Sequence, residues 1–319
     1  MRPPGHPISR TELEADVYAG LSKSGQKELY SKYFYDDLGT ALFDAITLLP
    51  EYGLARADMR LLQTYAGDLA ARARNVSVIV ELGSGYGEKA RAILPRFLRE
   101  HRLTYCPIDL SAAALNRCQR DLDDLHNLTI VPIEDSYLKG LDTASKMRRR
   151  GTAVLVLFLG SSIGNFEPEV AETFVRQVRE NLQREDTFLL STDLVKPADQ
   201  ILTAYKDPLG LTAAFNLNLL ARINRELGAD FNLETFRHEA RYNEADQRIE
   251  MHLRSAVDQT VNIKNFTVSL KQDETIWTES SYKFRPEQVR AMSERSGFRC
   301  EVQWLDSAWP FAQTLLSAI

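Results

Sequence analysis

The chain contains little cysteine, with three residues among 319. Cys106, Cys118 and Cys300 form no C-x-x-C pair, and an odd number in a chain of this length argues against a framework of disulfides. We therefore expect the protein to reside in a reducing compartment.

The sequence also lacks long apolar runs and an excess of positive charge. No apolar stretch approaches the roughly 20 residues that a membrane-spanning helix requires, and the N-terminal segment carries charges where a signal peptide would be apolar. The net charge of −5, without a block rich in lysine and arginine, argues against binding to nucleic acid or to an anionic membrane. We expect a cytoplasmic monomer whose partner is a small molecule.

Metal-binding motifs are missing as well. None of the histidines belongs to an H-E-x-x-H motif, and a lone histidine on a strand is usually an ordinary side chain that holds no metal. We therefore predict that no metal is bound. The histidines are His6, His101, His126, His238 and His252.

What the sequence does contain is a regular alternation between residues 57 and 192. Segments with a helical period separate short apolar runs, the former at 57–74, 87–100, 111–125 and 169–182, the latter at 76–82, 103–108, 128–133, 153–160 and 187–192. This alternation predicts an α/β fold with βαβ units and a parallel sheet covered by helices on both faces. Ligands of such sheets bind beyond the carboxyl ends of the strands.

The flanking segments do not continue this pattern. Residues 10–50 have a helical pattern and many aromatics, 197–227 predict a helix, and 248–270 alternate like a β-hairpin. The last stretch, 300–319, predicts two antiparallel strands at the edge of the parallel sheet, because the central block has few strand candidates of its own. We expect one domain from 56–195 with 283–319 and a second, discontinuous α+β domain from 1–55 with 196–282.

A glycine-rich turn follows the first apolar run, in the sequence VELGSGYGEK of residues 80–89. Glycine permits a positive φ, and its missing Cβ lets a ligand lie against the backbone. A dinucleotide fingerprint beginning at Gly83 would require glycine at position 88, where Glu88 instead places a carboxylate against the pyrophosphate. A register through Gly85 to Ala90 satisfies the looser fingerprint, so a dinucleotide is disfavoured but stays open.

A ligand with a positive centre and no phosphates tolerates acidic surroundings, and S-adenosylmethionine (SAM) is such a ligand. Asp109 ends the second apolar run, where a carboxylate can accept both ribose hydroxyls, and Asp135 follows the third run, in position for the adenine amino group. Lys89 is either a partner of the cofactor's carboxylate tail or a solvated helix residue. Each aspartate alone would suit a helix cap, but the glycine turn and the acids together predict an adenosine site.

Long motifs elsewhere in the chain resemble those of the histidine-specific α-N-methyltransferases of ergothioneine biosynthesis. The resemblance extends from about residue 33 to 311 and rests on YFYDDLGTALFDAITLLPEY, VELGSGYGEK, FLGSSIGNF, TDLVKP, GLTAAFNLNLL, INRELGADFN, RIEMHLRS and ESSYKFRPE. It implies a class I, Rossmann-like methyltransferase domain with a discontinuous substrate domain. It also implies three successive methylations of the α-amine of L-histidine by SAM, which give hercynine and S-adenosylhomocysteine.

The resemblance further implies roles for individual residues. Tyr52, Asn165 and Tyr205 match positions that hold the amino-acid backbone of histidine. Glu279 and Ser281 match positions that hold the imidazole, and Met251 matches a position beside the ring. The residues that match cofactor contacts are Gly83, Lys89, Asp109, Asp135 and Ser136, and Gly85 lies in the same turn.

These residues also have purely structural interpretations. Glu279 and Ser281 lie on one face of a strand by period-2 alternation, which fits a ligand site and a solvated edge equally. Asn165 could be a turn residue, and Tyr52 and Tyr205 could be core aromatics.

Three functions stay open at this stage. The first is a histidine N-methyltransferase, the second a methyltransferase of another free amino acid such as a tryptophan derivative, and the third a non-catalytic module that binds an adenosine ligand. A carboxylate at Glu279 favours imidazole over indole. Two sites in one chain favour an enzyme.

Overall fold

The computed structural model describes residues 10–99 and 102–319 and divides into two compact units. The first unit contains Leu54–Val195 and Phe284–Ile319, and the described part of the second contains residues 10–53 and Lys196–Lys283. Residues 1–9 of the predicted second domain, His6 among them, and His101 lie outside the described residues. Within the described part, no helix is both long and apolar enough to cross a bilayer.

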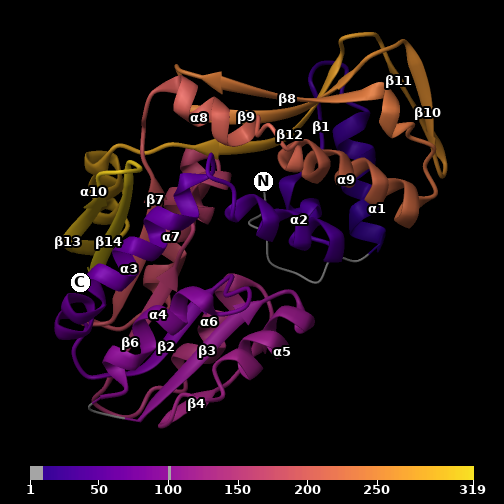
Figure 1. The fold of residues 1–319 in the computed structure, drawn as a ribbon. Helices are drawn as coiled ribbons and strands as arrows, with labels where there is room; N and C mark the ends of the chain where they lie inside the picture. The colour runs from indigo at the N-terminus through magenta and orange to yellow at the C-terminus, as the bar shows by residue number, and fades with distance from the viewer. Residues whose placement is uncertain (1–9, 100–101) are drawn as a thin grey trace. The chain divides into compact units, whose positions relative to one another are not determined.

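The first unit is built on one mixed sheet (Figure 1). In order along the sheet its strands are β13 (Phe298–Asp306), β14 (Phe311–Ala318), β7 (Thr187–Asp193), β6 (Ala153–Phe158), β2 (Val76–Leu82), β3 (Leu103–Asp109) and β4 (Leu128–Ile130), with β5 (Ile133–Glu134) also paired to β3. Strands β7 to β4 run parallel, whereas β14 is antiparallel to both of its neighbours. The predicted parallel sheet and its two antiparallel edge strands are confirmed.

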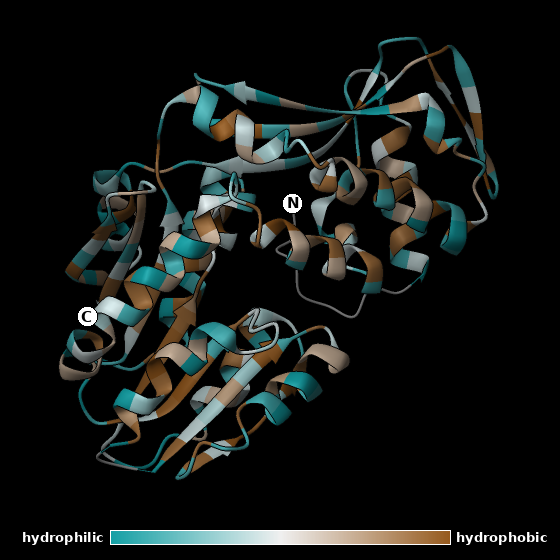
Figure 2. Ribbon diagram, in the orientation of Figure 1, coloured by the Kyte–Doolittle hydropathy of each residue, from teal (hydrophilic) through white to brown (hydrophobic). Residues whose placement is uncertain are grey.

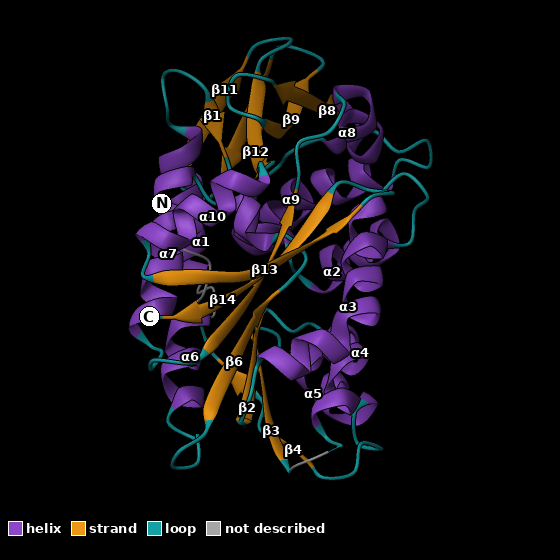
Figure 3. Ribbon diagram, turned by 90° about the vertical axis from the view of Figure 1, so that its left-hand side faces the viewer, coloured by secondary structure: helices purple, strands orange, loops and turns teal. Residues whose placement is uncertain are grey.

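Helices cover both faces of this sheet, as its buried and largely apolar central strands require. Every residue of β2 and β6 is buried, and in Figure 2 the apolar strands are brown beside helices that carry teal residues. Figure 3 shows one set of helices on each side of the sheet. One set is α3 (Gly53–Arg72), α4 (Glu88–Phe97) and α5 (Ala112–Asp121), and the other is α6 (Tyr137–Ser145), α7 (Pro168–Glu180) and α10 (Pro286–Arg295).

The strand order places a topological switch point at β2. The next strand along the chain, β3, pairs with one edge of β2, and β6 pairs with its other edge. In sheets of this kind, ligands bind beside such a point, at the carboxyl ends of the strands.

The second unit combines a twisted sheet, a separate hairpin and helices. The sheet has the order β1 (Lys27–Glu28), β12 (Thr275–Tyr282), β9 (Arg248–Ser255) and β8 (Phe236–Asn243). Helices α8 (Ala198–Tyr205) and α9 (Leu211–Leu227) contact β8 and β9, while α1 (Arg10–Leu21) and α2 (Asp37–Thr47) contact α9. The aromatic N-terminal segment contributes to this packing, because Phe34 stacks on Phe215 of α9 with ring centroids 4.5 Å apart.

Two details of the predicted second domain are wrong. Residues 248–270 do not form one hairpin: β9 pairs with β8 and β12, whereas β10 (Gln259–Ile263) pairs with β11 (Phe266–Leu270). The two residues after Ile263 make a tight turn, in which Lys264 has φ 47°, and this short connection fixes the local pairing.

The helix predicted for 197–227 is also divided, into α8 and α9. Pro208 lacks a backbone N–H, and Gly210 has φ 73°, so the chain leaves the helical conformation here. Asp207 then accepts hydrogen bonds from the backbone N–H groups of Leu211 and Thr212, both at 2.8 Å, and starts the second helix.

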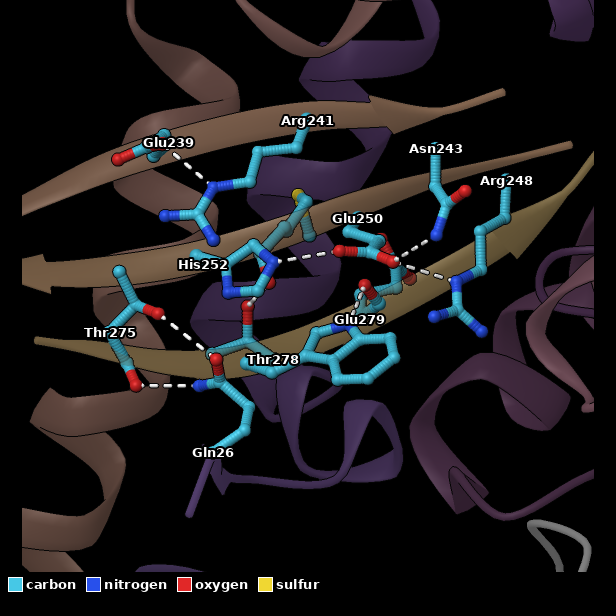
Figure 4. A network of polar contacts seen from close by, with 12 residues as sticks. Gln26, Glu239, Arg241, Asn243, Arg248, Glu250, His252, Thr275, Thr278 and Glu279 are labelled. Atoms are coloured by element: carbon cyan, nitrogen blue, oxygen red, sulfur yellow. Dashed lines mark hydrogen bonds and ion pairs between the residues drawn. The ribbon is translucent and has the colours of Figure 1, made fainter. Parts of the chain in front are cut away.

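A β-bulge in β12 determines which side chains share a face of the sheet. The pairing with β9 shifts between Trp277 and Glu279, so that Trp277 lies opposite His252 and Glu279 lies opposite Met251. The extra residue, Thr278, is buried and donates its hydroxyl to the Met251 carbonyl at 3.0 Å. The Trp277 indole N–H donates to the Glu279 carbonyl at 2.8 Å (Figure 4). These bonds satisfy backbone groups that the bulge removes from the ladder.

Replacing Thr278 by valine should therefore lower the free energy of unfolding by about 1–3 kcal/mol, because the Met251 carbonyl would be buried without its hydroxyl donor. Urea denaturation measures the change. The matched control is Thr260→Val, the same isosteric replacement at an exposed strand position, which should stay within about 0.5 kcal/mol of the wild type. Equal effects at the two positions would contradict the role of the Thr278 hydroxyl.

Candidate functional site

The glycine turn joins β2 to α4 and adopts backbone conformations that other residues rarely reach. Gly83, Gly85 and Gly87 have φ values of 73°, 52° and 76°. A Cβ on Gly87 would lie 2.5 Å from Cys118 Sγ, whereas a Cβ on Gly85 would meet nothing within 4 Å. Gly87 is therefore required by packing, and Gly85 borders open space in which a ligand can approach the backbone.

The two predicted aspartates lie at the carboxyl ends of neighbouring strands. Asp109 ends β3 and accepts hydrogen bonds from the backbone N–H groups of Gly85 and Ser111, both at 3.0 Å. Asp135 follows β5, which pairs with the end of β3, and accepts from the Ser136 N–H at 2.6 Å. The structure thus brings Gly85, Asp109, Asp135 and Ser136 to one end of the sheet. A carboxylate has about four lone-pair sites, so Asp109 can accept further hydrogen bonds from a ligand.

Lys89, the other predicted cofactor residue, is held by a carboxylate that the sequence analysis did not identify. Asp58 of α3 is fully buried, and its Oδ2 lies 2.9 Å from Lys89 Nζ. The same carboxylate accepts the backbone N–H of Gly160 at 2.8 Å, the Ser191 hydroxyl at 2.8 Å and the Gln313 amide at 2.6 Å. Asp58 thereby holds the ammonium of Lys89 near the end of β6, where a Cβ on Gly160 would lie 2.8 Å from it.

Asn165 lies in the first unit, after β6. Gly160 and Ser161 have φ values of 75° and 61° and turn the chain into a short 3-10 helix, Ser162–Asn165. The Ser161 hydroxyl accepts the Asp193 backbone N–H at 2.8 Å, which ties this turn to the end of β7. Asn165 is half-buried at the end of this turn, at the same end of the sheet as the glycine turn.

The first unit fits an adenosine ligand with a positive centre. Of the described residues, Ser84 in the glycine turn has a buried hydroxyl without a hydrogen-bond partner, which a polar group of a ligand could satisfy. The turn, Asp109, Asp135 and Lys89 supply acceptors, backbone donors and one ammonium. This donor and acceptor set matches the ribose, adenine and amino-acid parts of SAM.

Glu81, the glutamate that precedes the turn, is a structural group. It is buried in β2 and accepts a hydrogen bond from the Tyr105 hydroxyl of β3. Burial raises the pKa of Glu81 to about 7, although Tyr105 and Lys89 act in the opposite direction. The proton equilibrium of this carboxyl group is thus coupled to folding near neutral pH.

Three predicted substrate residues share one face of the sheet in the second unit. Met251 is buried in β9, Glu279 lies directly opposite it on β12, and Ser281 lies opposite Ile249. Because Ile249 and Met251 alternate with residues of the other face, the side chains of Met251, Glu279 and Ser281 project to the same side. Burial raises the pKa of Glu279 to about 7, and the charge of Lys283 lowers it in part.

Tyr205 and Tyr52 belong to the same unit. Lys283, which is buried, lies 2.9 Å from the Ser281 hydroxyl and 3.4 Å from the Tyr205 hydroxyl. The rings of Tyr52 and Tyr205 pack edge to face with centroids 6.4 Å apart. Thus Tyr205, Ser281 and Lys283 are in contact, Glu279 shares their face, and Tyr52 packs against Tyr205.

His238 fixes the backbone beside this cluster. Its Nδ1 accepts from the Asn216 amide at 2.9 Å, so its Nε2–H donates to the Tyr205 carbonyl at 2.8 Å. Burial lowers the pKa of His238, which agrees with this neutral tautomer. The end of α8 is therefore tied to β8.

The opposite face of the same sheet carries a network of charged side chains, shown in Figure 4. Glu250 accepts hydrogen bonds from Arg248 at 2.8 Å and pairs with His252 Nε2 at 3.1 Å. His252 stacks on Trp277, with Arg248 over the same indole ring at 4.6 Å. Among the described residues no group of three or more His, Cys, Asp or Glu side chains is arranged to hold a metal ion.

Asp58 and Lys283 were missed by the sequence analysis, although each leaves a signal. Asp58 interrupts the apolar face of its helix, where Leu54, Leu61 and Leu62 are buried. Lys283 stands two residues after Ser281, so period-2 alternation continues the polar face of the strand. A charged residue on an otherwise apolar helix face, or one that continues a row of polar residues along a strand, is therefore a candidate for a buried charge.

Comparison with known proteins identifies relatives over nearly the whole chain. A family model described as histidine-specific methyltransferase, SAM-dependent, matches residues 13–318. Histidine N-alpha-methyltransferase of Mycobacterium tuberculosis is 38% identical over 318 residues, which are 98% of this chain and 96% of that protein. The enzyme of the same name from Mycolicibacterium smegmatis is 39% identical over 308 residues, 95% and 94% of the two chains. A solved SAM-dependent methyltransferase from Clostridium acetobutylicum is similar with a TM-score of 0.49 and 11% identity, over 89% of this chain and 99% of its own.

The raised pKa of Glu81 predicts a pH dependence of stability. A carboxyl group whose pKa is raised by folding stabilises the native state below its unfolded pKa, and this contribution is lost as pH rises through about 7. The free energy of unfolding should therefore fall more between about pH 5 and about pH 8 in the wild type than in Glu81→Gln, as measured by urea denaturation. Glu88→Gln, an exposed control, should follow the wild type; a Glu81→Gln variant that did the same would contradict the assignment.

Proposed function

Because the chain belongs to the SAM-dependent, histidine-specific methyltransferases, we propose that it methylates the α-amino group of L-histidine three times to give hercynine, the first step of ergothioneine biosynthesis. The observation that carries the choice of substrate is the shared face of Met251, Glu279 and Ser281 on the sheet of the second unit. One carboxylate and one hydroxyl suit the two nitrogens of an imidazole.

The first unit provides the proposed cofactor site. Asp109 would accept the ribose hydroxyls, Asp135 and Ser136 would hold the adenine, and the glycine turn would lie against the rest of the ligand. Lys89, positioned by Asp58 at 2.9 Å, would pair with the carboxylate of the amino-acid tail. Bound SAM supplies an electrophilic methyl group.

The second unit provides most of the proposed substrate site. Glu279 would accept the imidazole N–H and Ser281 would bond the other ring nitrogen, with Met251 beside the ring. Tyr52, Tyr205 and Asn165 would hold the amino-acid backbone. Hydroxyl and amide groups can orient the α-amine without occupying its lone pair, and positioning of this kind is the main requirement for a direct displacement.

Two other functions are tested by the same site. A methyltransferase of a tryptophan derivative would have to bury an indole against Glu279, and an indole has one N–H and no second nitrogen for Ser281. A non-catalytic module that binds an adenosine ligand would not need the substrate face at all. Buried groups that lose their partners discriminate strongly against the wrong ligand, so the residues favour histidine.

Mass spectrometry after incubation with SAM and L-histidine tests the proposal. Products that carry one, two and three added methyl groups are expected, with the trimethylated product accumulating last. Methylation of a tryptophan derivative alone, or binding of S-adenosylhomocysteine without any turnover, would support the two alternatives instead.

Replacing Glu279 should affect histidine and spare the cofactor. Glu279→Ala and the isosteric Glu279→Gln should each raise the KM for histidine by about tenfold or more, while calorimetry should find the affinity for S-adenosylhomocysteine unchanged. Since Glu279 ionises near pH 7, the ratio of the Gln variant's KM to that of the wild type should grow from about pH 6 to about pH 8. A ratio that stays constant, or an equal loss of cofactor affinity, would contradict this role.

Replacing Gly85, in contrast to Glu279, should weaken the binding of the cofactor. A Cβ at Gly85 meets nothing within 4 Å of the protein, so Gly85→Ala should fold but bind S-adenosylhomocysteine at least about tenfold more weakly, because the methyl group would occupy the space of the ligand. Gly151→Ala is the matched control, since Gly151 also has a positive φ of 76° and an open surround but precedes β6 at the other end of the sheet. Calorimetry that finds equal losses for the two variants would contradict the proposed cofactor site.

A cytoplasmic location, a monomeric state and the lack of nucleic acid and membrane partners stay predictions from composition. The relative contributions of the two units to binding stay predictions as well, and the variants above separate them.

A further inference from the structure

Lys283 is a buried lysine on the proposed substrate face that the function described so far does not use. Its relative exposure is 3%, and that of Ser281 is 6%. Lys283 Nζ lies 2.9 Å from the Ser281 hydroxyl oxygen and 3.4 Å from that of Tyr205. It also lies 5.3 Å from the centre of the Tyr205 ring. A lysine in this position is costly to bury, which points to a role.

The chemistry of an ammonium group determines what this contact does to Ser281. A lysine ammonium has three donors and no acceptor, so the Ser281 oxygen must accept the hydrogen bond from Lys283. The serine's own hydrogen must then point away from Nζ, because two hydrogens cannot face each other along the same 2.9 Å line. On its other side Ser281 thus keeps its hydrogen and one lone pair, and the nearby ammonium favours donation there.

We propose that Lys283 is a positioning residue that directs the hydrogen of the Ser281 hydroxyl toward the ligand and thereby makes the substrate face prefer a neutral imidazole in one tautomer. This inference rests on the proposed function. Neutral imidazole has one N–H donor and one bare nitrogen acceptor. The first suits the Glu279 carboxylate, and the second suits the hydroxyl hydrogen that Ser281 directs away from Lys283.

The same arrangement rejects related ligands. An imidazolium has two N–H donors and a positive charge, so one N–H would have to displace the Ser281 hydrogen and lie near the Lys283 charge. An indole has one N–H and leaves the serine hydroxyl without its acceptor. Lys283 thus adds to a discrimination that Glu279 alone does not provide, because a carboxylate accepts from imidazole, imidazolium and indole alike.

The charge of Lys283 also acts on Glu279. It lowers the pKa of this carboxyl group against the larger effect of burial, so it favours the ionised form that accepts the imidazole N–H. The other titratable groups around the cluster are Tyr205 of α8, with Tyr52 packed on it, and His238 of β8, which contacts the Tyr205 backbone. Removing the ammonium should therefore move the ionisation of Glu279 to higher pH.

A merely structural lysine would behave differently. If Lys283 served only to tie the end of β12 to α8 through Tyr205, its loss would lower stability and activity without regard to Ser281 or to pH. A double-mutant cycle separates the two roles, because residues that act through one another give non-additive effects.

The experiment compares Ser281→Ala, Lys283→Met and the double variant by kcat/KM for L-histidine at saturating SAM. Each single variant should lose about tenfold to a hundredfold, mainly in KM, and the double variant should lose little more than the worse of the two. Losses that multiply would overturn the proposal. Calorimetry with S-adenosylhomocysteine, which should bind all three variants as it binds the wild type, verifies that the proteins are folded.

The pH profile of the histidine KM gives the second measurement. Lys283→Met should displace the profile toward higher pH, whereas Ser281→Ala should leave its position unchanged. Lys283→Arg keeps the charge and should also keep the wild-type position, and it serves as the variant of choice if Lys283→Met does not fold. An unshifted Lys283→Met profile, or a shifted Lys283→Arg profile, would overturn the proposal. Wild-type protein that does not methylate histidine would instead overturn the proposed function.

Discussion

The buried carboxylate of Asp58 holds several groups in place at one end of the sheet. Ligands of the first unit would bind at this end. A buried carboxylate is tolerated only when its oxygens are paired and hydrogen-bonded, and Asp58 meets this requirement with a lysine, a backbone N–H, a serine and a glutamine. Those partners come from α4, the end of β6, β7 and β14. The orientation of Lys89 and the turn at Gly160 are thus consequences of one charge that has to be satisfied.

The second unit solves the corresponding problem with a bulge. If Thr278 were paired regularly instead of bulged, strict alternation would place Glu279 on the same face as Trp277 and the charged network of Figure 4. The bulge instead turns Glu279 and Ser281 to the face of Met251, where α8 and α9 cover the sheet. Its two side-chain hydrogen bonds hold the irregularity in place. A local departure from regular pairing therefore decides which face of the sheet carries Glu279 and Ser281.

The sequence predicted the first unit better than the second for a physical reason. Buried parallel strands are continuous apolar runs, and glycines with positive φ mark the turn after β2, so both leave strong local signals. In the second unit the pairing of 248–270 depended on a short turn at Lys264, and the Glu279 face depended on a bulge, neither of which periodicity reveals. The grouping of Met251, Glu279 and Ser281 came from resemblance. Asp58 and Lys283 were not found, because a charged residue inside an apolar or mixed pattern is normally attributed to the surface.

Two glutamates whose pKa burial raises to about 7 show how surroundings assign different roles to one side chain. Glu81 receives a permanent hydrogen bond from Tyr105 on the neighbouring strand, so its proton equilibrium is coupled to folding. Glu279 is half-buried, and the charge of Lys283 favours its ionised form. A carboxylate poised in this way gains most from a ligand that brings an N–H to it, because that bond completes the stabilisation that burial has removed. In the proposed function, the energy of desolvating Glu279 would thereby be converted into preference for a ligand with a donor in the right place, and the adjacent Ser281 would distinguish among such donors.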